Sequence, residues 1–310
     1  MANTLEQAFS EFRSRLELNP SFQRPISEHH NSVRDFLTSV DNSITTQLIG
    51  SLQRRTRIQP RQDDAFDIDI LVILGNFNHW VEEGGVFPST ALHRVESYIA
   101  RSTRYRKMGP ETDSPAIVLE YTNNVSVELI PGYIDWIGCH RDGTPCLPKG
   151  RGYWIPKHNE WVLADYDHDA EYISRVNQNS EGYLIPAIKI LKAIKRNCFP
   201  EMRSYHIEVL ATNIIPGLVR YFRGSNIQIT YERLICCFFE VAKNSICGGT
   251  LIPGSKSEPA NLYMNDAAKQ NLKRAFETIT VHCKDVLLKS EEEKILLYRN
   301  LCGDPFPAYG

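Results

Sequence analysis

The stretch that decides the fold of this chain is Ala65-Phe66-Asp67-Ile68-Asp69-Ile70-Leu71-Val72-Ile73-Leu74. Its aliphatic and β-branched residues favour a β-strand, and the run after Asp69 predicts that the strand continues into a buried core. Side chains two positions apart on a strand point the same way, so Asp67 and Asp69 share one face, roughly 6.6 Å apart along the strand. Charges at the mouth of a buried strand are costly unless they are paired or bound to metal, which indicates a functional site.

An Asp-x-Asp pair also arises by chance on a solvated strand face, and a Gly-Ser pair is most often an ordinary loop. Here Gly50-Ser51 lies upstream of the acids, and glycine lets backbone amides approach a phosphate closely. Two carboxylates at this separation can converge on two cations about 3.5–4 Å apart, an arrangement suited to nucleoside triphosphates. The sequence therefore predicts a Mg²⁺ site, which Mn²⁺ can also fill, at Asp67 and Asp69.

A third carboxylate is expected for two-metal chemistry, to complete the ion site and to accept a proton. The run Val125-Ser126-Val127-Glu128-Leu129-Ile130 predicts a second strand on which Glu128 points away from Val127 and Leu129. The alternative for Glu128 is an edge-strand acid in water. Asp135 is the reserve candidate, although Pro131-Gly132 is expected to end the strand before it.

Composition limits the class of protein. The chain has 310 residues, 42% of them hydrophobic, and a formal charge of −2, which favours a globular fold of two lobes or two domains and excludes a disordered chain or a general polyelectrolyte binder. Basic clusters at residues 54–61, 101–107 and 189–196 are either solvated faces or phosphate contacts. The first cluster is close in sequence to Asp67, which favours a role with phosphates.

Several features predict a cytoplasmic protein without membrane partners. The eight cysteines lack a C-x-x-C spacing, which favours a reducing compartment. The first residues lack the basic start and apolar core of a signal peptide, and no apolar run approaches the length of a membrane span.

The expected helices and strands follow from periodicity and capping signals. Helices are predicted at 5–16, around 33–40, at 92–101, 183–197 and 268–288, and from 290 to about 302, with strands at 116–121 and 125–130. The C-terminal half is therefore mostly helical. On the helix at 183–197, Lys192 lies on a basic face.

The order of motifs resembles one known family. In sequence these are Gly50-Ser51, Asp67-x-Asp69, Val127-Glu128-Leu129-Ile130-Pro131, Gly152-Tyr153-Trp154-Ile155-Pro156, Leu191-Lys192 and Ser204-Tyr205-His206-Ile207-Glu208-Val209-Leu210. Over roughly residues 45–215 they are similar to the bacterial cGAS/DncV-like nucleotidyltransferases (CD-NTases), relatives of cyclic GMP-AMP synthase and oligoadenylate synthase. The resemblance implies an α+β fold with a polymerase-β-like nucleotidyltransferase lobe, a mixed sheet and a helical C-terminal lobe. The expected division is 1–165 and 166–310, with a tail at about 303–310.

The resemblance also implies roles for particular residues. Asp67, Asp69 and Glu128 would be catalytic and metal-binding, while the nucleotide-binding residues would be Gly50, Ser51, Lys192, Ser204 and Tyr205. Tyr205 would stack on a base, a contact worth about 1–3 kcal/mol. The alternatives are a solvated helix face for Lys192 and a core or interlobe tyrosine for Tyr205.

The chain departs from the family pattern at two positions. Glu128 stands where an Asp is usual, which moves the carboxylate outward by about 1.5 Å. Arg55 stands where many members have glycine.

The activity implied is the joining of nucleoside triphosphates into a cyclic di- or trinucleotide that acts as an antiphage (CBASS) second messenger sensed by a downstream effector. A linear 2′–5′ oligonucleotide synthase or an RNA nucleotidyltransferase is an alternative, as is a nucleotide-binding sensor with weak catalysis. The expected state is a monomer, and Gly310 is a candidate for conjugation by an E1/E2-like partner, the alternative being a frayed tail.

Overall fold

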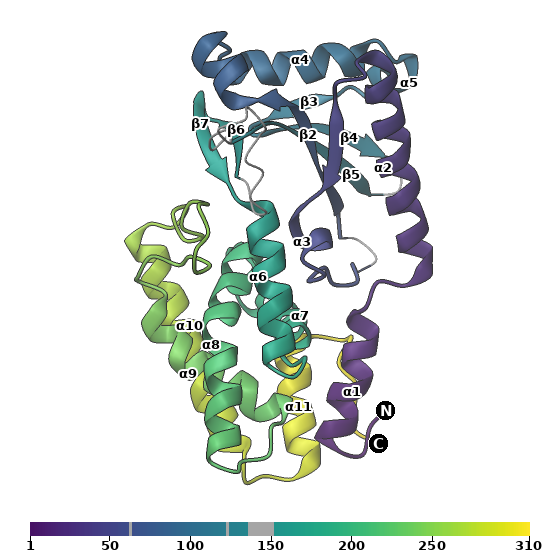
Figure 1. Cartoon of the computed structure of the whole chain (residues 1–310). Coiled ribbons are helices and arrows are strands. Elements are labelled where there is room, and N and C mark those ends of the chain that lie inside the picture. Colours follow the sequence, from purple (N-terminus) through teal and green to yellow (C-terminus); the bar gives the residue numbers. More distant parts are fainter. Residues whose placement is uncertain (62–63, 122–123, 136–151) are drawn as a thin grey trace.

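The computed structural model describes residues 1–61, 64–121, 124–135 and 152–310. A mixed sheet with its helices forms one end of the molecule and a bundle of helices forms the other (Figure 1). The two chain ends lie side by side on the helical end, where the amide of Ala2 donates to the carbonyl of Ala308 at 2.9 Å. The α+β fold with a mixed sheet and a helical C-terminal part is confirmed.

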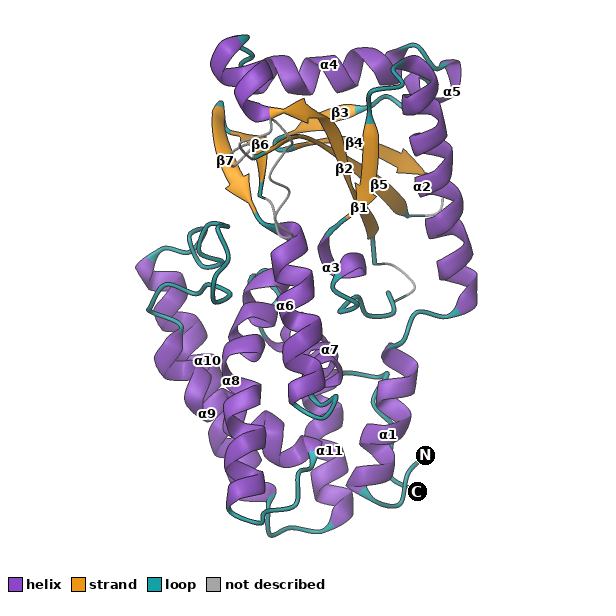
Figure 2. Cartoon of the chain, viewed as in Figure 1, coloured by secondary structure: helices purple, strands orange, loops and turns teal. Residues whose placement is uncertain are grey.

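The sheet has its strands in the order β1-β2-β5-β4-β3, with β6 added to β5 and β7 added to β6. Strands β2 and β5 are parallel, and the other pairs are antiparallel (Figure 2). The bounds are β1 (Thr45–Leu48), β2 (Phe66–Asn76), β3 (Glu111–Asp113), β4 (Ala116–Tyr121), β5 (Val125–Ile134), β6 (Tyr153–Lys157) and β7 (Glu160–Ala164). The central pair, β2 and β5, carries all three predicted acids.

Helices cover one face of this sheet. They are α2 (Pro20–Val40), α4 (Pro88–Ala100) and α5 (Thr103–Arg106), with the π-helix η1 (Asn78–Glu83) beside them and the short α3 (Gly50–Gln53) at the other face. Leu37 of α2 and Val95 of α4 are fully buried against Ile68 and Ile70 of β2. The sheet core therefore forms on the side opposite to Asp67 and Asp69.

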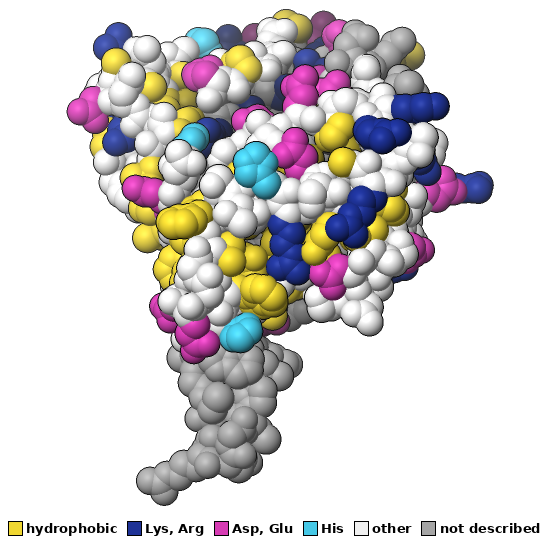
Figure 3. All heavy atoms as spheres, turned by 90° about the horizontal axis from the view of Figure 1, so that it is seen from above, with side chains coloured by type: hydrophobic (Ala, Val, Ile, Leu, Met, Phe, Trp, Pro, Cys, Tyr) yellow, Lys and Arg dark blue, Asp and Glu magenta, His cyan; other side chains and the backbone are white. Residues whose placement is uncertain are grey.

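The outer surface of the sheet end carries no single type of side chain. Seen from above, basic, acidic and hydrophobic groups are interspersed over the described part of this face (Figure 3). This mixture agrees with the small net charge of −2.

The helical end is built from seven helices among the described residues. They are α1 (Leu5–Leu16), α6 (Tyr166–Asn179), α7 (Leu184–Cys198), α8 (Ser204–Gly224), α9 (Tyr231–Ser245), α10 (Asp266–Val286) and α11 (Glu291–Cys302). Helix α1 packs in this bundle, with Phe9 and Phe12 against Phe306. The expected division grouped α1 with the sheet. In the structure α1 packs with the helical end, because the helices there cover its apolar face. The division at 165/166 itself stays a prediction.

The local signals had mixed success. Thr4 caps α1 by accepting from the amide of Gln7 at 3.3 Å, and Ser290 forms the capping box of α11. The second helix starts much earlier than expected, at Pro20, because Pro25 lies inside it and hides its periodicity.

The expected end of the second strand at Pro131-Gly132 is wrong, since β5 runs on to Ile134. Strand β4 pairs with β5 only as far as Leu129, and β6 pairs only from Tyr133. On this edge of β5, Pro131 therefore lies in the gap between the end of β4 and the start of β6. Its missing N–H breaks no ladder hydrogen bond on this edge.

No helix in the described part of the chain is both long enough and apolar enough to cross a membrane.

Candidate active site

The three predicted acids lie on adjacent parallel strands. Asp69 of β2 is in register with Glu128 of β5, and Asp67 is in register with Ser126. The Oγ of Ser126 donates to Oδ1 of Asp67 at 2.7 Å. Because residues in register on neighbouring strands point to the same face, the carboxylates share the face that looks towards the helical end.

The electrostatics of these carboxylates are unfavourable in the protein alone. Burial, followed by the charges of Asp69 and Asp67, raises the pKa of Glu128 to about 7. Burial raises the pKa of Asp69 to about 6, against the opposing charges of Arg54 and Arg57. A divalent cation would neutralise this excess of negative charge, and carboxylate oxygens are the ligands that Mg²⁺ prefers.

The residues present thus fit a divalent cation by donor chemistry and by charge. Within residues 1–61, 64–121, 124–135 and 152–310, however, no group of three or more His, Cys, Asp or Glu side chains is already arranged to hold a metal ion. Binding would require these neighbouring carboxylates to converge.

The Gly50-Ser51 pair forms the start of α3 directly beside the acids. Gly50 has φ of +67°, and a Cβ built on it would lie 2.1 Å from Oδ2 of Asp69. The amide of Ile49 also donates to the carbonyl of Asp69 at 3.0 Å. Glycine is therefore required here both by the left-handed backbone and by the close approach to the carboxylate.

A cavity of about 420 Å³ opens beside this turn and is lined by residues of both ends of the molecule. Its walls include predicted site residues, namely Gly50, Ser51, Asp67, Asp69, Lys192, Ser204 and Tyr205. Cations from two of the basic clusters also line it, namely Arg54, Arg57, Lys195 and Arg196. Glu128 does not appear among the described residues that line it. The structure thus brings carboxylates and cations together around one cavity, where Asp64 and Glu208 also contribute to the lining.

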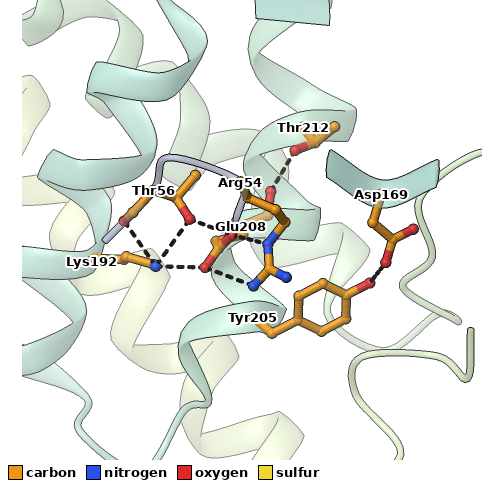
Figure 4. A network of polar contacts seen from close by, with 7 residues as sticks. All are labelled: Arg54, Thr56, Asp169, Lys192, Tyr205, Glu208 and Thr212. Carbon is orange, nitrogen blue, oxygen red and sulfur yellow. Dashed lines mark hydrogen bonds and ion pairs between the residues drawn. The ribbon is translucent and has the colours of Figure 1, made fainter. Parts of the chain in front are cut away.

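Lys192 is not on a solvated face, because it is only 4% exposed. Its ammonium nitrogen lies 2.5 Å from Oε1 of Glu208 and donates to the carbonyl of Thr56 at 3.0 Å (Figure 4). Burial lowers the pKa of Lys192 to about 8, although the charge of Glu208 opposes this. The side chain reaches the cavity wall while it remains part of a buried polar network.

Tyr205 connects this cavity with a second one. Its hydroxyl donates to Oδ2 of Asp169 at 2.5 Å, and the guanidinium of Arg54 lies 4.9 Å from its ring centroid. The second cavity, of about 570 Å³, shares Gly50, Arg54, Asp69 and Tyr205 with the first. Its remaining walls are largely apolar and include Ile130, Ile155, Val162, Leu163, Pro259 and Leu262.

The reserve acid Asp135 serves a different purpose. Its Oδ1 accepts from the indole Nε1 of Trp154 at 2.9 Å, and its Oδ2 lies 3.4 Å from the ammonium of Lys256. These contacts tie β6 and the segment before α10 to the end of β5, and Asp135 lines neither of the two described cavities.

Sequence reasoning missed Glu208 and Asp169. Glu208 lies inside the motif that carries Ser204 and Tyr205, and an acid between apolar residues on a helix expected to be buried was the signal that could have pointed to it. Asp169 gave no such signal, because it lies in the polar start of α6.

The chain is similar to proteins named as nucleotide synthases. Residues 3–140 match the family model of the Second Messenger Oligonucleotide or Dinucleotide Synthetase domain. A cyclic AMP-AMP-AMP synthase from Acinetobacter sp. is 22% identical over 98% of this chain and 86% of its own length. A probable cyclic nucleotide synthase from Bacillus cereus is also 22% identical, over 84% of this chain and 81% of its own length.

Solved structures share the fold. The CD-NTase CdnG of Bradyrhizobium diazoefficiens, in complex with GTP, superposes with a TM-score of 0.71 at 14% identity, over 98% of this chain and 96% of that one. The cyclic AMP-GMP synthase DncV of Vibrio cholerae, with a linear intermediate, gives 0.71 at 10% identity, over 99% and 98%. Residues 3–140 thus match the synthetase domain model, and nearly the whole chain shares the fold of cGAS/DncV-like nucleotidyltransferases and is similar to proteins named as cyclic nucleotide synthases.

Proposed function

We propose that this protein joins nucleoside triphosphates into a cyclic di- or trinucleotide by in-line nucleotidyl transfer. The observation that carries the proposal is a cavity lined by Asp67 and Asp69, with Glu128 in register beside Asp69, and by five cations, namely Arg54, Arg57, Lys192, Lys195 and Arg196. Carboxylates and cations around one cavity match a substrate that carries a triphosphate and reacts at a metal-dependent centre.

The carboxylates supply the reacting end of the site. Asp67, Asp69 and Glu128 would hold Mg²⁺ or Mn²⁺, which when bound supplies charge neutralisation at the α-phosphate and activates the attacking ribose hydroxyl. With a pKa of about 7 in the protein alone, Glu128 can also accept a proton near neutral pH. The longer side chain of Glu128 is compatible with this role because it is adjacent to Asp69 in the register.

The triphosphate tail is assigned to the cations of the first cavity and to the helix start and turn beside them. Ser204 is the first residue of α8, where backbone N–H groups have no partner within the helix and favour anions. Gly50 and Ser51 contribute the turn on the opposite side. Lys192, Lys195 and Arg196 add positive charge from α7.

The second cavity suits the base of a nucleotide. It begins at Asp69 and Tyr205 and continues between apolar walls, as expected for a site that buries an aromatic ring. One face of the Tyr205 ring is covered by Arg54, so a base would stack on the other face. The similarity to a cyclic AMP-AMP-AMP synthase supports adenine as one base.

The biological role proposed is an antiphage second messenger that a downstream effector senses. Conjugation of Gly310 by an E1/E2-like partner is part of this proposal. Phe306 is fully buried and Ala308 bonds to Ala2, whereas Tyr309 and Gly310 are exposed. A conjugating enzyme would therefore have to release part of the tail, and deletion of Gly310 should abolish any linkage.

The test is incubation of the protein with the four nucleoside triphosphates and Mg²⁺ or Mn²⁺, followed by phosphatase treatment, chromatography and mass spectrometry. We expect phosphatase-resistant cyclic products that disappear in Asp67→Asn/Asp69→Asn. The control Asp135→Asn should retain them, because Asp135 lies outside both cavities. Linear products alone would establish the linear synthase or RNA transferase instead. Binding of nucleotide without any product would establish the sensor.

A further inference from the structure

A single buried carboxylate joins the two ends of the molecule at the nucleotide site. Glu208 of α8 has no exposed surface. Its Oε2 accepts from Nε of Arg54 and from the hydroxyl of Thr56, each at 2.8 Å. Its Oε1 lies 2.5 Å from the ammonium nitrogen of Lys192 and 3.4 Å from Nη2 of Arg54 (Figure 4). Both oxygens of Glu208 are thus fully engaged by cations and a hydroxyl.

The partners of Glu208 are themselves connected to the Gly50-Ser51 turn. The amide of Arg54 donates to the carbonyl of Gly50 at 3.2 Å, and the amide of Thr56 donates to the carbonyl of Ser51 at 3.0 Å. Arg54 and Thr56 belong to the segment that follows α3, whereas Lys192 comes from α7. The carboxylate therefore fixes the turn relative to two helices of the other end.

We propose that Glu208 is a positioning residue for the nucleotide, which holds Lys192 and the Gly50-Ser51 turn in the geometry that receives the triphosphate. This inference rests on the proposed function of the first cavity. Glu208 lines the first cavity, but both of its oxygens are already engaged by Arg54, Thr56 and Lys192, and a carboxylate repels an anionic triphosphate, so it acts through these partners.

Charge supports the same role. The groups that face Lys192 are Glu208 from α8, Arg54 and Arg57 from the segment after α3, and Asp69 from β2. Burial lowers the pKa of Lys192, Glu208 raises it, and Arg54 and Arg57 lower it, with a net value of about 8. Burial raises the pKa of Glu208, but Arg54 and Lys192 outweigh this and hold it at about 2, so the carboxylate is charged at every pH of interest. Without it, Lys192 would lose its proton below pH 8.

The test uses Glu208→Gln, which keeps the shape of the side chain and removes its charge. The probe is 2′,3′-dideoxyadenosine triphosphate with Mg²⁺, which lacks the attacking hydroxyls, so affinity is measured without turnover. We expect the affinity of the unmodified protein for this probe to decline above about pH 8. The affinity of Glu208→Gln should begin to decline at least one pH unit lower, so that at pH 8 it is about tenfold weaker than that of the unmodified protein. The control Glu232→Gln, a half-buried glutamate paired with Lys294, should follow the unmodified protein.

Turnover provides a second readout. Glu208→Gln should raise KM for the nucleotide about tenfold or more and change kcat less, because the contact is made before the transition state. If the affinity of Glu208→Gln stays within twofold of that of the unmodified protein and declines above the same pH, the proposal is overturned. The binding assay needs no catalysis. If the protein makes no product but the decline in affinity shifts to lower pH in Glu208→Gln, this inference is supported and the proposed synthase is refuted.

A milder variant covers the case in which Glu208→Gln does not fold. Thr56→Val removes the hydrogen bond to Glu208 and the 3.4 Å contact between its hydroxyl and the ammonium of Lys192, and leaves Lys192 and Arg54 paired with the carboxylate. We expect a threefold to tenfold loss of affinity for the probe, while the pH above which the affinity declines stays unchanged. Unchanged affinity in Thr56→Val, with Glu208→Gln unfolded, would count against a positioning role.

Discussion

The contact between Gly50 and Asp69 allows stability and catalysis to be separated by one substitution, Gly50→Ala. Alanine would place its Cβ 2.1 Å from Oδ2 of Asp69, so either the carboxylate or the turn must move by about 1 Å. The backbone at φ of +67° adds a strain of about 1–2 kcal/mol for any residue with a Cβ. The substitution therefore has two costs with different consequences.

The backbone strain should lower the free energy of unfolding, and the displacement of Asp69 should lower the catalytic rate. A misplacement of about 1 Å at a catalytic group costs about 100-fold in rate, equivalent to about 2.7 kcal/mol in the activation barrier. The control is Gly109→Ala, because Gly109 has φ of +64° and a Cβ on it would meet nothing within 4 Å. It should lose a similar 1–2 kcal/mol of stability and no activity.

The assays are urea unfolding and the rate of cyclic product formation at saturating nucleotide. We expect equal losses of stability in the two variants and a rate loss of about 100-fold in Gly50→Ala alone. Activity within threefold of the unmodified protein in Gly50→Ala would refute the argument that the close approach of the turn fixes Asp69. A comparable rate loss in Gly109→Ala would show that strain alone reduces turnover.

Three further predictions follow from the same structure. In metal-free protein, Glu128→Gln should raise the melting temperature at pH 8 by about 2 °C more than at pH 4.5. The reason is that the pKa of Glu128 is raised to about 7 in the folded state, so Glu128 lowers stability as pH rises from its unfolded pKa through 7. Thermal unfolding in EDTA measures this, and an equal change in melting temperature at the two pH values contradicts it. Arg55 is exposed with φ of +59°, so Arg55→Gly should be about 1 kcal/mol more stable than Arg55→Ala in urea unfolding, and the reverse order would exclude strain. Phe306 is fully buried against Phe12, so Phe306→Ala should lose about 3–5 kcal/mol, whereas Tyr309→Ala at the exposed end should stay within about 0.5 kcal/mol; equal losses would show that the tail is not anchored at Phe306.

The predicted acids show how far strand periodicity reaches. Alternation along β2 and β5 is a local property, so the shared face of Asp67 and Asp69 and the outward direction of Glu128 were predictable. The register that brings Asp69 beside Glu128 was not, because it depends on how two distant strands pair. The continuation of β5 through Pro131 was missed for the same reason, since the gap between β4 and β6 is visible only in the assembled sheet.

Lys192 shows the corresponding limit for helices. Periodicity placed it on a basic face of α7, where a solvated lysine is the ordinary outcome. Its burial depends on α8 and on the segment after α3, which together supply Glu208 and the carbonyl of Thr56. A helix pattern records which residues share a face, but it does not record which other elements cover that face.

The sequence by itself thus determined the acid pair on one strand face, and its motifs carried the family resemblance that implied the α+β class, because these depend on residues close together in the chain. Only the tertiary structure decided that Glu208 joins Arg54, Thr56 and Lys192 into one buried network, and that carboxylates and cations line the same cavity. Arg54 and Glu208 are 154 positions apart, and a charge can be buried at such a place only when the completed fold brings its partners within hydrogen-bonding distance.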